Sequence, residues 1–93
     1  MSLDVSKLTE KIKKVYGVDV VISESYTLGV DEIDPDFFDD GKMKELQDNN
    51  ITEVMGHSGY VVEDNGGANG NTFSVITEVE DPINIYGFVV FED

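Results

Sequence analysis

The spacing of apolar residues changes at Gly17, and this change constrains the fold more than any other feature of the sequence. Before Gly17, apolar residues recur three and four positions apart, which predicts an amphipathic helix with one apolar face made of Val5, Leu8, Ile12, Val15 and Tyr16. After Gly17 they alternate with polar residues, which predicts a half-buried strand with one apolar face made of Val18, Val20, Ile22, Tyr26 and Leu28. The chain is therefore expected to begin with a helix and to continue into a sheet.

Turn residues and apolar runs predict where the remaining helices and strands lie along the chain. Asp34 and Pro35 suit the start of a second helix, which we expect over 35–48 with a break at Gly41. The glycines at 56 and 59 predict a turn between strands. Further strands are expected near 51–55, 59–64, 72–80 and 83–91, with a hairpin loop at 65–71.

The length and the order of these elements predict the fold class. A chain of 93 residues suits one domain that buries about 60 to 65% of its unfolded surface. We therefore expect a single acidic α+β domain over 1–93, in which an N-terminal helix and a second short helix pack on one face of a mostly antiparallel sheet.

The last expected strand carries an unusual apolar stretch. Phe88, Val89, Val90 and Phe91 are consecutive, so the strand is apolar on both faces. This pattern indicates either a central strand or one that meets a second copy of the chain. The stretch is accordingly our candidate homodimer interface.

Acidic residues dominate the charge and limit the choice of partner. The chain has 20 Asp and Glu against 6 Lys and no Arg, for a formal net charge of −14. Four of the lysines fall within residues 1–14, so nearly all of the excess lies after them. A surface of this sign excludes nucleic acid and anionic membranes as default partners and favours a cationic protein. The absence of guanidinium groups also argues against binding of phosphates.

The sequence offers no site for catalysis, cofactor or metal. The single histidine, His57, precedes Ser58, but neighbouring residues of an extended chain point to opposite faces and make a poor nucleophile and base. With no Cys, only oxygen ligands for Mg²⁺ or Ca²⁺ remain, and the acidic run does not follow the register of a calcium loop. No apolar run approaches the roughly 18 residues of a membrane helix. We expect a cytoplasmic protein that is not an enzyme.

The acids form clusters, which suggests that they imitate the phosphates of DNA. Acids two apart on a strand, or three and four apart on a helix, lie roughly 5 to 7 Å from one another, near the spacing of alternate phosphates. The hypothesis is an inhibitor that occupies the basic groove of a DNA-binding protein. The candidate partner-binding residues are Asp31, Glu32, Asp34, Asp36, Asp39, Asp40, Glu45, Asp48, Glu63, Asp64, Glu78, Glu80 and Asp81.

The same acidity is compatible with three alternatives to DNA mimicry. A halophilic origin would make acidic surfaces general, although the basic first helix argues against an even spread of acids. An acidic antidote or adaptor for a basic protein unrelated to DNA would carry the same charge. A small enzyme or metal-binding protein could use the same carboxylates as ligands or as acids and bases.

The whole chain resembles a known family. The segment from Asp4 to Ile22, the acidic run from Asp31 to Asp40 and the β-rich second half are similar to the Arn anti-restriction proteins of T-even phages. Members of that family are acidic α+β DNA mimics that protect phage DNA from the modification-dependent host endonuclease McrBC. The resemblance implies a phage protein that acts in the host cytoplasm and has a restriction endonuclease as its partner.

Overall fold

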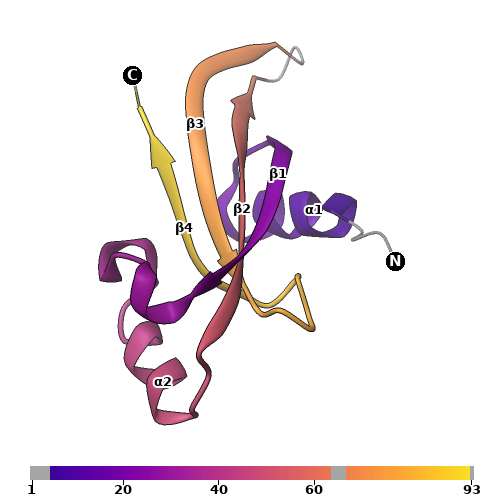
Figure 1. Cartoon of the computed structure of the whole chain (residues 1–93). Coiled ribbons are helices and arrows are strands. Elements are labelled where there is room, and N and C mark those ends of the chain that lie inside the picture. Colours follow the sequence, from indigo (N-terminus) through magenta and orange to yellow (C-terminus); the bar gives the residue numbers. More distant parts are fainter. Residues whose placement is uncertain (1–4, 64–66, 93) are drawn as a thin grey trace.

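The computed structural model describes residues 5–63 and 67–92. The four strands form one antiparallel sheet in the order β1-β2-β3-β4 (Figure 1). This arrangement confirms the predicted α+β fold with an N-terminal helix. Along the chain the elements are α1 (Val5–Tyr16), β1 (Val20–Gly29), the 3-10 helices η1 (Val30–Glu32) and η2 (Pro35–Phe37), α2 (Lys42–Asp48), β2 (Glu53–Val62), β3 (Ala68–Thr77) and β4 (Ile85–Phe91).

The two α-helices cover opposite faces of the sheet, so the expectation that both pack on one face is wrong. Leu8 and Ile12 of α1 pack in a cluster that contains Val75. Leu46 of α2 packs in a second cluster that contains Ile76. Because neighbouring residues of a strand point to opposite faces, the two clusters lie on the two sides of β3. Figure 1 shows α1 and α2 at different ends of the sheet.

A bulge in β1 explains why one strand serves both clusters. The register with β2 shifts between Ile22 and Glu24, which inserts one extra residue. Ile22 therefore packs against the α1 cluster, whereas Leu28 packs against the α2 cluster. The prediction that the alternate apolar residues from Val18 to Leu28 share one face is wrong beyond the bulge.

The segment 56–59 lies inside β2 and is not a turn. A Cβ at Gly56 would meet the ring of Tyr26, and a Cβ at Gly59 would collide with the carbonyl group of Val21. These glycines therefore allow close packing against β1 and do not reverse the chain. As a result the two strands expected at 51–55 and 59–64 form one, and His57 between them is fully buried.

β4 is an edge strand, which corrects the alternative that placed it at the centre. Phe88 and Val90 pack against the α1 cluster. Phe91 lies on the other face, where its ring contacts Phe37 edge-on with centroids 5.7 Å apart. The α1 cluster covers one face of the strand, and Phe37 of η2 covers part of the other, where Phe91 remains 41% exposed.

The second predicted helix divides at Gly41, as expected. Asp34 caps η2 by accepting a hydrogen bond from the Asp36 backbone N–H at 3.0 Å. Gly41 then takes a left-handed conformation with φ of 74°, which favours glycine, and α2 begins at Lys42. β3 spans Ala68–Thr77, earlier than the predicted 72–80. No helix within 5–63 and 67–92 is long and apolar enough to cross a membrane.

Candidate partner-binding surface

The connection between β1 and β2 carries most of the predicted acids. It contains η1, η2 and α2, and its apolar residues Val30, Ile33 and Leu46 are buried in the α2 cluster. Burial of these side chains leaves the intervening acids on the outside. The exposed acids of this connection are Asp31, Glu32, Asp34, Asp36, Asp39, Asp40, Glu45 and Asp48.

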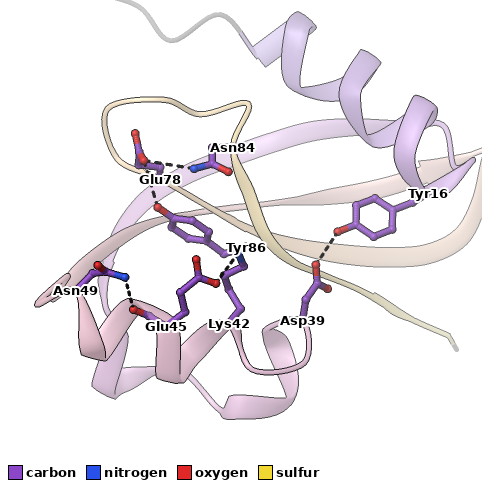
Figure 2. A network of polar contacts seen from close by, with 8 residues as sticks. All are labelled: Tyr16, Asp39, Lys42, Glu45, Asn49, Glu78, Asn84 and Tyr86. Carbon is purple, nitrogen blue, oxygen red and sulfur yellow. Dashed lines mark hydrogen bonds and ion pairs between the residues drawn. The ribbon is translucent and has the colours of Figure 1, made fainter.

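The turn between β3 and β4 adds acids at the same place, because Tyr86 joins the two segments. The Tyr86 hydroxyl donates a hydrogen bond of 3.3 Å to Glu78 Oε1, which also accepts one of 3.3 Å from Asn84 Nδ2 (Figure 2). Burial raises the pKa of Tyr86, and the carboxylates of Glu78, Glu45 and Asp81 raise it further. Acids from distant parts of the sequence therefore surround one phenol.

Lys42 and a backbone contact fix α2 beside this phenol. The ammonium group of Lys42 lies 5.8 Å from the centroid of the Tyr86 ring and forms an ion pair of 3.0 Å with Glu45. The Asp39 backbone N–H donates to the Tyr86 carbonyl at 2.9 Å. Figure 2 shows the Lys42–Glu45 ion pair of α2 beside Tyr86 of β4. The acids of α2 are thus held on a packed element.

A hollow separates α1 from the β3–β4 turn on the neighbouring side. It has a volume of about 410 Å³, and Asp39 and Asp81 line it together with Lys11. The Tyr16 hydroxyl donates to Asp39 across 3.4 Å, and the pKa of Tyr16 is raised by burial and then by that carboxylate. Val15 is 55% exposed beside the hollow and does not join the buried face that the sequence predicted for it.

The predicted acids outside the 31–48 connection are divided between two ends of the sheet. Glu78 is half-buried, and Glu80 and Asp81 are exposed in the turn after β3. Glu63 follows β2 at the opposite end, where it lines a groove with Lys13 and Lys14 of α1. The candidate Asp64 lies outside the described residues.

Two of the predicted carboxylate spacings do not apply. β3 ends at Thr77, so Glu78 and Glu80 are not neighbours on one face of a strand. Asp36 belongs to η2 whereas Asp39 and Asp40 lie between η2 and α2, so no single helix carries the three. The carboxylates therefore gather through tertiary packing and do not form one regular row.

Glu53 is an acid that the sequence pattern did not single out. It lines a hollow of about 310 Å³ together with Glu78 and Glu80. β2 and β3 run antiparallel with Met55 opposite Thr77, which brings the start of β2 beside the β3–β4 turn. Pairing of the two predicted strands as a hairpin would have been the signal for this residue.

The charges at this end are mostly without cationic partners. Of the predicted site residues that the structure describes, only Glu45 forms an ion pair, and its partner is Lys42. Within 5–63 and 67–92, no three His, Asp or Glu residues are grouped so that they could hold a metal ion. We define the acidic end as the 31–48 connection with Glu53, Glu78, Glu80 and Asp81.

Comparisons with models of protein families, with curated proteins and with solved structures find no match to this chain.

Proposed function

We propose that the chain is a DNA-mimic inhibitor whose acidic end occupies the basic DNA-binding groove of another protein. The observation that carries the proposal is the assembly of acids from two distant segments around Tyr86. The acids of the 31–48 connection are exposed and six lysines cannot neutralise 20 acids, so negative charge at this end faces solvent. No enzymatic activity is part of this proposal.

Carboxylates held on a folded surface can replace phosphates electrostatically. A groove lined by Lys and Arg attracts negative charge over roughly a Debye length, about 10 Å at 0.1 M salt. Binding of this kind is fast, competes directly with DNA and weakens as salt increases. The resemblance to the Arn proteins makes a modification-dependent endonuclease such as McrBC the first target to test.

The test is inhibition of DNA cleavage by that endonuclease. The triple variant Asp36→Asn, Asp40→Asn and Asp81→Asn removes three exposed charges from the acidic end. The matched control, Glu10→Gln, Glu63→Gln and Glu92→Gln, removes three exposed charges elsewhere. Exposed ion pairs contribute about 0.2 to 1 kcal/mol each, so the first variant should inhibit roughly 3- to 100-fold less well. Equal losses in both variants would contradict a specific acidic end.

We also propose that two copies pair through the sheet face near the end of β4. One row crosses all four strands there, with Val21, Tyr60, Thr72 and Phe91 directly opposite one another. Val21, Tyr60 and Phe91 are each about 40% exposed. None of the four carries a charge, so the row itself adds no repulsion between two acidic copies.

Sedimentation over a range of concentrations tests this pairing. Phe91→Ser should shift the equilibrium to monomer, whereas Val79→Ser, at an equally exposed apolar residue outside the row, should not. Higher salt should strengthen the dimer because it screens the repulsion. A chain that sediments as a monomer at every concentration and salt would contradict the proposal.

A further inference from the structure

A chain of polar side chains crosses three strands on the α1 face of the sheet. Ser25 in β1 lies directly opposite His57 in β2, and Ser25 Oγ is 2.8 Å from His57 Nδ1. The other ring nitrogen, His57 Nε2, is 3.0 Å from Thr77 Oγ1 in β3. His57 and Thr77 are fully buried, whereas Ser25 is exposed on the edge strand.

These contacts suit the tautomer of His57 that carries its proton on Nε2. Thr77 Oγ1 lies 3.4 Å from the Glu78 carbonyl oxygen, which can only accept, so the Thr77 hydroxyl donates there. In this tautomer Thr77 Oγ1 accepts from His57 Nε2–H. His57 Nδ1 is then unprotonated and accepts the hydrogen bond from the Ser25 hydroxyl.

We propose that Ser25 is an activated nucleophile, with His57 as its general base and Thr77 as the positioning residue that fixes the tautomer. The order of an exposed hydroxyl, a buried base and an orienting group is that of a nucleophilic serine. Ser58, the serine next to His57 in the sequence, is a poor partner for it, whereas Ser25 comes to His57 through the pairing of β1 with β2.

The substrate class is a small electrophile that transfers an acyl or phosphoryl group, such as an activated ester. Ser25 Oγ forms a bond to the carbonyl carbon or phosphorus while its proton passes to His57 Nδ1. The bond to the leaving group breaks with its electron pair, and the leaving group or solvent then takes the proton from His57. Ser25 stays covalently modified at the end of this step.

Diisopropyl fluorophosphate is the probe, because fluoride is its leaving group and the product has a defined mass. The intact protein should gain one adduct, and peptide mapping should place it on Ser25. Ser23 is the internal control, since it is exposed two residues away and its hydroxyl donates to the Ser58 carbonyl at 3.3 Å. General-base assistance contributes about 10² to 10⁴-fold, so Ser25 should react at least tenfold faster than Ser23.

Variants distinguish a serine that His57 activates from one that is exposed but not activated. Ser25→Ala should abolish the adduct and Ser23→Ala should leave it unchanged. Thr77→Val should slow labelling, and Thr77→Ser should restore it. Labelling of Ser23 and Ser25 at equal rates, or no labelling of the folded protein, would overturn the proposal.

Nuclear magnetic resonance of the wild-type protein gives a readout that does not depend on any variant folding. The chain has one histidine, so the ¹⁵N signals of its ring belong to His57 without ambiguity. The proposal requires a protonated Nε2 and an unprotonated Nδ1 at pH 7.5. The opposite tautomer would overturn it.

Discussion

His57 links the stability of the fold to pH. Burial lowers its pKa from the ordinary 6.5, and the groups that face it, Ser25, Thr77 and the opposite residue Val75, carry no charge. The folded protein therefore holds His57 neutral where the unfolded chain already binds a proton. The stability that depends on neutral His57 is complete above pH 6.5 and is lost as pH falls below it towards the folded-state pKa.

Urea unfolding between pH 7.5 and pH 5.2 tests this dependence. One proton contributes at most about 1.4 kcal/mol per pH unit to the free energy of unfolding. This window spans the ordinary pKa of histidine and lies above the ordinary carboxylate values near 4. The variant His57→Gln should remove the pH dependence, and an unchanged slope in that variant would assign the effect to other groups.

At the scale of elements, close packing of η2 on β4 holds the acidic connection in place. A Cβ at Gly87 would collide with the Phe37 carbonyl oxygen and come within 2.7 Å of Phe38 Cα. Backbone atoms cannot yield as a flexible side chain can. Gly87→Ala is therefore expected to lower the free energy of unfolding by about 1 to 3 kcal/mol.

Gly29→Ala is the control for that substitution. A Cβ there would meet Glu32 Oε1 at 2.7 Å, but this atom ends a flexible, exposed side chain that can move away. Urea unfolding should show a loss below about 1 kcal/mol for Gly29→Ala. Equal losses for both variants would mean that the contact between η2 and β4 is not specific.

The elements that sequence predicts well are those set by local patterns. The helix with Leu8 and Ile12, the Asp34 cap and the break at Gly41 follow from spacing and backbone conformation. The errors involve packing between elements, including the placement of the two helices on opposite faces of the sheet. The bulge before Glu24 and the close approach of β1 to Gly56 depend on neighbours that a single strand does not reveal.

The sequence likewise predicts one part of the candidate surface, whereas the rest depends on packing. The exposed acids of the 31–48 connection are visible as a run in the sequence. Their association with Glu53, Glu78 and Asp81 depends on the pairing of β2 with β3 and on Tyr86, and the separation of Glu63 depends on strand direction. Composition therefore predicts the charge, whereas topology decides which charges lie together.

For the molecule as a whole, self-repulsion should make stability increase with salt. A net charge of −14 on a small folded chain costs free energy, and salt screens it as the Debye length falls from about 30 Å at 0.01 M to about 10 Å at 0.1 M. Urea unfolding at these two NaCl concentrations should show a gain on the order of 1 kcal/mol. A constant or decreasing stability would mean that local ion pairs dominate over the net charge.

Displacement of DNA from a target tests the central claim most directly. A fluorescent modified duplex is bound to the DNA-binding subunit of a modification-dependent endonuclease, and its anisotropy is followed as the chain is added. DNA mimicry predicts complete release of the duplex, at chain concentrations that increase steeply as NaCl is raised from about 0.05 to about 0.2 M. A duplex that stays bound while the chain also binds the subunit would contradict DNA mimicry.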